Sequence, residues 1–338
     1  MALAVSAALI VAVVVLRIML LASVRRDARF ARAWQDVFAA RAAEPVRAEP
    51  PALANADRER FMGLFNRFQG SVRGDARVRL NALARQLGMD AYVRRQLGAR
   101  DLGRRMAAVR AAGYLRDAAA TPALDILAAG ANPVASLRAE HALLDIAGAE
   151  ALPEFLRKAG RREDWPLARV AAILAEREPQ ELSAPLAAAV REATAGGAAG
   201  PGAARLVRLL DCAPLEHATP VVAELLGGAT DAEILTAALS ALRDPGQLAR
   251  VRALAGHAEW FVRVEAVKAI ARLGVVEDRF LLLRMLADPS WWVRYRAAHA
   301  LAALPGCSTD YLRHVRNALP DRYAADMLAQ VIAERGPA

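Results

Sequence analysis

Two segments near the C-terminal end of this 338-residue chain repeat the same residue pattern. The first begins at Trp260 and ends at Leu273, and the second begins at Trp291 and ends at Leu304. The two segments start 31 residues apart. An interval of this length corresponds to one helical hairpin, which cannot bury its apolar face alone and therefore stacks on its neighbours. The pattern predicts a helical repeat array, whose exposed surface is suited to holding a partner.

The composition agrees with this prediction. Hydrophobic residues make up 56% of the chain and aromatic residues only 5%. Most of the apolar residues are Ala and Leu, which favour helices, so we predict an all-α fold. Cys212 and Cys307 lie far apart and outside any Cys-x-x-Cys spacing, which predicts neither a disulfide framework nor a thiolate metal site.

The N-terminal segment 2–24 is a run of apolar residues that contains a single charge, Arg17. It is long enough to cross a bilayer as a helix, so we predict one transmembrane helix over residues 1–24. A cleaved signal peptide is the alternative, but the segment lacks a basic start and a clear cleavage site. Positively charged flanks stay on the cytoplasmic side, which predicts an outward N-terminus and a cytoplasmic repeat domain. The flanking arginines are Arg25, Arg26, Arg29 and Arg32.

Arg17 has two possible roles within the predicted membrane helix. Its long side chain can reach back toward the inner headgroups at modest cost. Alternatively, it pairs with a polar or acidic group in the membrane helix of a partner, since charges inside membranes often mark such contacts.

The charge of the chain is unevenly distributed. The net charge is +9, but residues 24–110 hold 19 basic and 9 acidic residues, whereas residues 111–338 hold 25 and 27. The basic excess thus follows the predicted anchor, where an anionic membrane surface attracts it. We therefore expect the partner to be a protein at the membrane and not a nucleic acid.

Residues 25–40 place Phe30, Trp34 and Phe38 on one side, with arginines largely on the other. This is typical of a helix that lies in the membrane interface, but it also fits a membrane helix that continues into the cytosol. Residues 41–56 contain three prolines and predict an extended linker. The repeat domain then covers 57–338.

We predict about eight helical hairpins in this domain from the spacing of the repeats. Their ranges are 57–98, 99–130, 131–161, 162–200, 201–228, 229–257, 258–289 and 290–321, followed by a closing helix over Tyr323–Glu334. The Gly-rich stretch 196–202 cannot continue a helix, so it is either a longer loop or a hinge.

The pattern Asp-Pro-x-x-x-Val-Arg-x-x-x-Ala-x-x-Ala-Leu runs from Asp288 to Leu301. It resembles the short bacterial HEAT repeats of the phycobilisome-lyase type. The resemblance implies a right-handed α-solenoid, here preceded by one transmembrane helix. It also implies that each helix with a Val-Arg start is the second of its pair and lines the concave side. Residues 201–257 contain two Val-Arg pairs, Val207-Arg208 and Val251-Arg252, but no copy of the full pattern.

Two equivalent helices carry the candidate partner-binding residues, which are Trp260, Arg263, Trp291, Arg294 and His299. We expect Phe261 and Trp292 in the core, whereas exposed Trp260 and Trp291 beside arginine are typical of interaction hot spots.

The polar residues of the same segments offer two readings. Asp288 is expected to cap a helix, and Arg263 and Arg294 to bond across to neighbouring loops as a ladder; the alternative is that the ladder binds phosphate or carboxylate. His299 is expected on the inner helix as a partly buried polar residue beside the binding surface.

The sequence predicts no cofactor, no metal site and no enzymatic activity. The histidines do not pair with each other at ligand spacing, and no Gly-rich phosphate loop or Gly-x-Ser-x-Gly elbow occurs. The main hypothesis is a scaffold at the bacterial inner membrane that binds a membrane-embedded subunit of envelope or polysaccharide (glycosyltransferase) machinery. The alternatives are a nucleic-acid-binding HEAT-like protein and a HEAT-like lyase or cofactor-handling protein.

Overall fold

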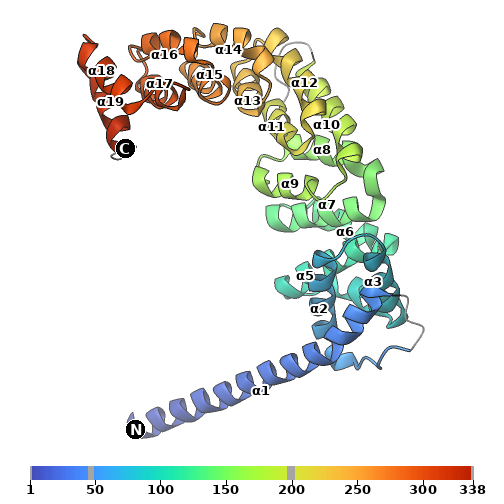
Figure 1. Cartoon of the computed structure of the whole chain (residues 1–338). Coiled ribbons are helices and arrows are strands. Elements are labelled where there is room, and N and C mark those ends of the chain that lie inside the picture. Colours follow the sequence, from blue (N-terminus) through green and yellow to red (C-terminus); the bar gives the residue numbers. More distant parts are fainter. Residues whose placement is uncertain (1, 45–48, 196–201, 336–338) are drawn as a thin grey trace. The chain divides into compact units, whose positions relative to one another are not determined.

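The computed structural model describes residues 2–44, 49–195 and 202–335 (Figure 1). For residues 2–12, 20, 22 and 23 it describes the backbone alone. All regular structure in these described ranges is helical, which confirms the predicted all-α class. Most of the Gly-rich stretch 196–202, predicted as a loop or hinge, lies outside the described residues.

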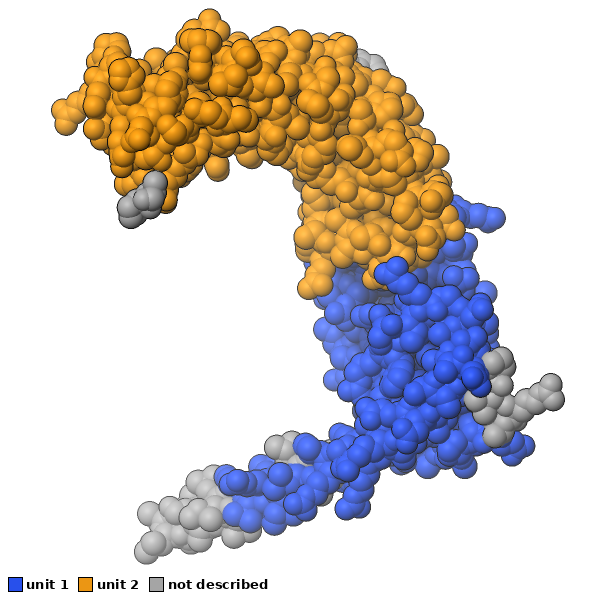
Figure 2. Space-filling model, viewed as in Figure 1, with its two compact units in different colours: residues 1–151 blue, residues 152–338 orange. Residues whose placement is uncertain are grey.

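The chain forms two compact units, residues 1–151 and 152–338, which Figure 2 distinguishes by colour. The first unit holds α1 (Ala2–Ala43), η1 (Asn55–Asp57), α2 (Arg58–Ser71), α3 (Asp75–Gln86), α4 (Met89–Gln96), α5 (Leu102–Leu115), η2 (Ala118–Ala120), α6 (Thr121–Ala128), α7 (Pro133–Ala147) and η3 (Gly148–Ala151). The second holds α8 (Leu152–Arg161), α9 (Leu167–Leu174), α10 (Pro179–Thr194), α11 (Ala203–Arg208), η4 (Leu209–Cys212), α12 (Leu215–Gly228), α13 (Ala232–Ala241), η5 (Pro245–Gln247), α14 (Leu248–Leu254), α15 (Trp260–Leu273), η6 (Val276–Asp278), α16 (Arg279–Met285), α17 (Trp291–Ala303), α18 (Thr309–Ala318) and α19 (Arg322–Glu334).

Helix α1 runs without a break through both the predicted membrane helix and the predicted interface helix. Its C-terminal part is held in the core of the first unit by Trp34 and Phe38, which are 5% and 0% exposed. Their rings contact Phe61 of α2 at centroid distances of 5.0 and 5.2 Å. The apolar side of residues 25–40 therefore packs on protein, which corrects the prediction that it lies in the membrane interface.

The predicted transmembrane helix is not confirmed. Among the residues that the structure describes, none of the helices has both the length and the apolar character that crossing a bilayer requires. The side chains of residues 2–12, which make up half of the predicted span, lie outside that description.

In the second unit, helices α11, α13, α15, α17 and α19 pack side by side in this order. Each of α12, α14, α16 and α18 packs mainly on the odd-numbered helix that follows it. Buried aliphatic residues at helical spacing form the contacts, for example Val262, Ala266 and Ile270 of α15, each 0% exposed. This arrangement is that of stacked helical hairpins.

The helices lie where the sequence predicts them, but they pair differently. Every predicted range from 99 to 321 contains two α-helices, and 57–98 contains three, α2 to α4. The range 258–289 would pair α15 with α16, whereas α15 packs on α14, and α16 packs on α17. The Val-Arg helices α15 and α17 are thus the second members of their pairs, as the HEAT resemblance implies.

An arginine side chain of α15 caps the C-terminal carbonyls of α13, the preceding helix of the same layer. Nη2 of Arg272, on α15, donates to the carbonyl of Leu239 on α13 at 2.8 Å. Burial lowers the pKa of Arg272 from its ordinary value, and a cation at a helix C-terminus is favoured by the exposed carbonyls and the helix dipole. This cap links neighbouring hairpins.

Candidate protein-binding surface on helices α15 and α17

Helices α15 and α17 begin with the same arrangement of side chains. In both, the third residue is a fully buried valine, Val262 or Val293, which fixes the helix on its neighbours. The two residues before each valine are then directed away from this core contact by the helical period of about 3.6 residues. The sequence thus places aromatic residues at the edge of the packed layer.

The tryptophans at these helix starts are exposed. Trp260 and Trp291 are 44% and 42% exposed, which agrees with the prediction from sequence. Trp292 is 53% exposed, so the prediction that it lies in the core is wrong, and Phe261 is only partly buried. The valine that follows them occupies the core position, which leaves both tryptophans of α17 outside.

The aromatic rings of α17 contact one another along the helix. Trp291 stacks on Tyr295 with ring centroids 5.2 Å apart and planes 8° apart. Trp292 meets Trp291 edge-on at 4.8 Å. On α15, Trp260 and Phe261 form a similar edge contact at 5.9 Å. Because these contacts hold the rings in place, each helix start presents a preformed apolar surface. We call these residues together the aromatic surface; they are Trp260, Phe261, Trp291, Trp292 and Tyr295.

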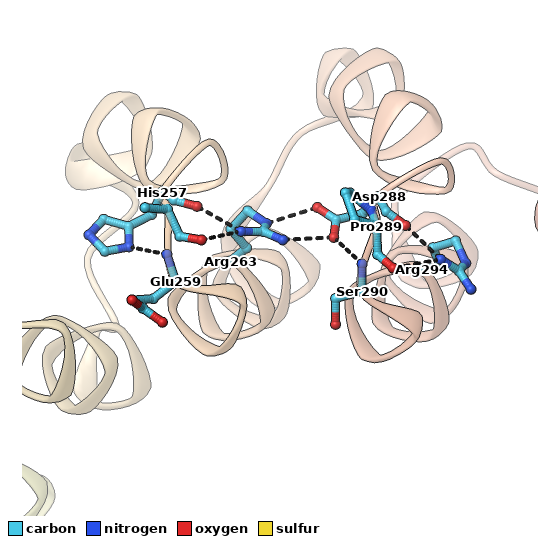
Figure 3. A network of polar contacts seen from close by, with 8 residues as sticks. His257, Glu259, Arg263, Asp288, Pro289, Ser290 and Arg294 are labelled. Carbon is cyan, nitrogen blue, oxygen red and sulfur yellow. Dashed lines mark hydrogen bonds and ion pairs between the residues drawn. The ribbon is translucent and has the colours of Figure 1, made fainter.

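Arg263 connects α15 to the loop before α17, as Figure 3 shows. Its Nε and Nη2 donate to the two carboxylate oxygens of Asp288, both at 2.8 Å. Its Nη1 donates to the carbonyls of His257 and Ala258 at 2.8 Å. The hydrogen bonds with Asp288 raise the pKa of Arg263. The side chains are 14% and 9% exposed, so Arg263 is a structural residue and not the partner contact that the sequence suggested.

Asp288 also holds the loop in which it lies. Its Oδ1 accepts a hydrogen bond from the amide of Ser290 at 2.8 Å. Nη1 of Arg294 donates to the carbonyls of Asp288 and Pro289 at 2.7 and 3.1 Å. The predicted ladder is thus confirmed for Arg263 (Figure 3), whereas the predicted cap is wrong, because Asp288 binds the amide of Ser290, which precedes α17, and α17 has no side-chain cap. Arg294 differs from Arg263 because its hydrogen bonds all go back to its own loop.

His299 lies one turn beyond Tyr295 on α17. It is partly buried, as predicted, and its ring lies edge-on to that of Tyr295 at 4.5 Å. Its Nε2 lies 3.3 Å from Oε2 of Glu334 on α19. His299 therefore joins α17 to α19 and borders the aromatic surface. No group of three or more potential metal ligands occurs in the part of the chain that the structure describes.

The residues predicted to lie at the membrane fall into two groups, buried aromatic residues and exposed arginines. Trp34 is buried against Phe61, and Phe30 is partly buried and stacks on Trp34 at 5.9 Å. These two aromatic residues belong to the core of the first unit. The arginines of the group are exposed along α1; they are Arg17, Arg25, Arg26, Arg29 and Arg32.

The sequence did not indicate a polar depression between α14 and α16. Its lining includes Arg252, Asp278 and Arg284. Burial alone would raise the pKa of Asp278, but hydrogen bonds from Arg252 and the Val275 amide lower it below its ordinary value. Because the carboxylate of Asp278 is already paired with Arg252, it is not available to bind a ligand in this depression.

Comparison with known proteins agrees with this geometry. A family model described as HEAT repeats matches residues 219–302 and 248–333. No curated protein sequence matches the chain. The chain is similar to the solved structure of Kap121p, at 12% identity and a TM-score of 0.49 over 89% of this chain and 37% of Kap121p.

Two further solved structures are similar over most of their own length. One is an engineered protein, at 16% identity and a TM-score of 0.34 over 83% of this chain and 87% of that protein. The other is human deoxyhypusine hydroxylase, at 18% identity and a TM-score of 0.30 over 73% and 97%. The family model covers residues 219–333, so this part of the chain, which includes α15 and α17, consists of HEAT repeats.

Proposed function

We propose that this protein is a scaffold that binds a partner protein through the exposed aromatic residues at the starts of α15 and α17. The observation that carries this proposal is the exposure of Trp260, Trp291 and Trp292, each more than 40% exposed. Tryptophan contributes much binding energy because it combines a large apolar area with few rotatable bonds, and it is enriched in interaction hot spots. Here the residues lie on neighbouring helices of one layer.

We further propose that the N-terminal part of α1 holds the scaffold at the bacterial inner membrane, with the repeats on the cytoplasmic side. Eight aliphatic side chains of this helix are each at least 48% exposed: Val13, Val14, Val15, Leu16, Ile18, Met19, Leu21 and Val24. They lie on all sides of the helix, and such a surface is stable only in an apolar environment. The arginines that follow favour the cytoplasmic side.

A membrane-embedded partner fits both proposals. Tethering raises the effective concentration of a partner in the same membrane without any new contact. The general organisation resembles HEAT proteins that accompany envelope machinery, so the proposed partner is a membrane subunit of such machinery, including glycosyltransferases of polysaccharide synthesis. This assignment depends on the resemblance alone.

Purification of the full chain in detergent tests the scaffold function. We expect a stoichiometric protein partner that is lost with the double variant Trp260→Ala/Trp291→Ala. Phe280→Ala is the matched control, because Phe280 is 62% exposed but belongs to α16, outside the aromatic surface. A partner that stays bound to the double variant, or a chain that purifies alone from its native membranes, contradicts the proposal. A protease-accessible tag after Ala338 on the outer side of the membrane contradicts the proposed orientation.

A further inference from the structure

The starts of α15, α17 and α19 can be compared by counting back from the first residue of each helix, although the loop before α19 has three residues and the other two loops have five. The residues just before these helices are Glu259, Ser290 and Asp321. Two residues earlier lie His257, Asp288 and Leu319. Nδ1 of His257 accepts a hydrogen bond from the Glu259 amide at 3.1 Å, as Oδ1 of Asp288 does from the Ser290 amide at 2.8 Å. Leu319 has no side-chain acceptor, so the third position of this series is apolar.

This difference leaves the last arginine of the ladder without a carboxylate. Arg263 pairs forward with Asp288 of the next repeat. The equivalent forward partner of Arg294 would be residue 319, which is a leucine. Within the described residues Arg294 bonds only to the carbonyls of its own loop, and its Nε is buried without a hydrogen-bond partner. Figure 3 shows Arg294 at the end of the ladder.

The surroundings of Arg294 add apolar surface and further positive charge. Trp291 and Trp292 precede it on α17 and are exposed. Arg296 is exposed, and its guanidinium lies 5.7 Å from the ring centroid of Tyr295. Asp288 is already paired with Arg263, and Asp321 accepts a hydrogen bond from the Tyr323 amide at 2.9 Å.

We propose that the start of α17 binds a protein segment in which an Asp or Glu lies within two residues of an aromatic or aliphatic side chain. The carboxylate pairs with Nη2 of Arg294, because Nη1 already donates to two carbonyls and Nε is buried, and the apolar side chain packs on Trp291 and Trp292. A charge-assisted hydrogen bond of this kind adds specificity for a carboxylate to the apolar contact. The inference rests on the scaffold function and names the chemistry of its partner.

A protein segment fits this surface better than a nucleic acid does. Residues 152–338 contain 23 basic and 22 acidic residues, so the second unit is almost neutral. Binding to nucleic acid gains most of its affinity from many phosphate contacts, which require a strongly basic surface. A single carboxylate needs only the one arginine that the ladder leaves without a partner.

An internal substitution tests the ladder without any ligand. Leu319→Asp places a carboxylate at the position that Asp288 takes for Arg263, and Leu319→Asn is the matched control of equal size. We expect the Asp variant to melt about 2 °C above the Asn variant, because a shift of this size corresponds to roughly one added charged hydrogen bond. The difference should vanish in an Arg294→Gln background. Equal melting temperatures of the two variants overturn the proposed pairing position.

Selection from a random-peptide library on the full chain in detergent tests the partner chemistry. We expect enriched peptides to contain an Asp or Glu next to an apolar residue, and their affinity to fall about tenfold with Arg294→Gln, which is the loss of roughly one charged hydrogen bond. In the Leu319→Asp variant, the new carboxylate should compete with the peptide for Arg294 and weaken binding about as much as Arg294→Gln does. Arg284→Gln is the control, because Arg284 is an exposed arginine of α16, and it should leave the affinity unchanged.

Each other outcome of the selection has a defined meaning. Peptides that need Trp291 but neither an acidic residue nor Arg294 overturn this inference and leave the scaffold function standing. A selection without enrichment, or peptides that bind independently of both residues, overturns the inference and removes the aromatic surface from the proposed function. Steeply salt-dependent binding of a single-stranded DNA oligonucleotide, lost with Arg294→Gln, overturns it in favour of nucleic acid.

Discussion

Gly113 of α5 lies directly against Ala142 of α7. A Cβ atom added at Gly113 would lie 2.9 Å from the Cα of Ala142 and 3.1 Å from its Cβ. These distances are shorter than ordinary van der Waals contact, so the close approach of the two helices requires glycine. The contact helps to fix how the hairpins of the first unit stack.

Gly113→Ala is therefore expected to destabilise the first unit by about 1–3 kcal/mol, the usual effect of overpacking. Gly63→Ala is the matched control, since Gly63 also lies within a helix but has no atom within 4 Å of an added Cβ. It should stabilise the protein by about 0.5–1 kcal/mol through helix propensity. Urea unfolding followed by circular dichroism measures both. Equal effects of the two substitutions would show that the helices can move apart freely.

The ion pair between Arg263 and Asp288 should contribute more to stability than the equivalent contacts of Arg294. Arg263→Gln is expected to cost about 1.5–3 kcal/mol, because it leaves a largely buried carboxylate without its charged donors. Arg294→Gln removes hydrogen bonds to two carbonyls only and should cost about 1 kcal/mol. A double-mutant cycle with Asp288→Asn measures the coupling. A coupling near zero between Arg263 and Asp288 would refute the structural ladder.

Asp278 should make the stability of the second unit sensitive to acid. Its folded pKa lies below the ordinary value because Arg252 and the Val275 amide donate to it, against the effect of burial. The stabilisation is therefore complete above the ordinary pKa of about 3.9 and is lost as pH falls through the lower folded value. Asp278→Asn should lower stability at pH 7 and flatten its fall below about pH 4. Melting temperatures measured across pH 3–7 check this prediction. Asp310→Asn is the control, because the side chain of Asp310 is 89% exposed.

Trp34 should hold α1 to the first unit. Trp34→Ala removes a ring that is 5% exposed and lies 5.0 Å from Phe61, so we expect a loss of about 3–5 kcal/mol. Trp260→Ala removes a ring that is 44% exposed and should cost less than about 1 kcal/mol. Hydrogen exchange of the α1 amides shows whether the helix detaches. Similar losses for the two variants would indicate that Trp260 is part of the core.

Local patterns in the sequence were sufficient for the secondary structure and part of the surface. The interval between Trp260 and Trp291 predicted the helices α15 and α17, and the same spacing predicted the ranges that hold the remaining helices of the repeats. The exposure of both tryptophans followed from their place at helix starts. These features depend on helical periodicity and backbone propensity, which act over a few residues.

Other features depended on which helices come into contact. The interval between repeats is the same whether α15 pairs with α14 or with α16. The interval alone therefore cannot predict which two helices form a hairpin. Trp292 is exposed because the neighbouring Val293 takes the core position. Trp34 is buried because α1 meets Phe61 of α2.

The sequence by itself determined an all-α chain of stacked repeats with aromatic residues at two helix starts. The tertiary structure alone decided the pairing of the helices and the burial of Trp34. It also decided that Arg294, unlike Arg263, bonds to the carbonyls of its own loop and not to a carboxylate of the next repeat. The physical reason is that periodicity is set within each helix, whereas burial and ion pairing are set between helices distant in the chain.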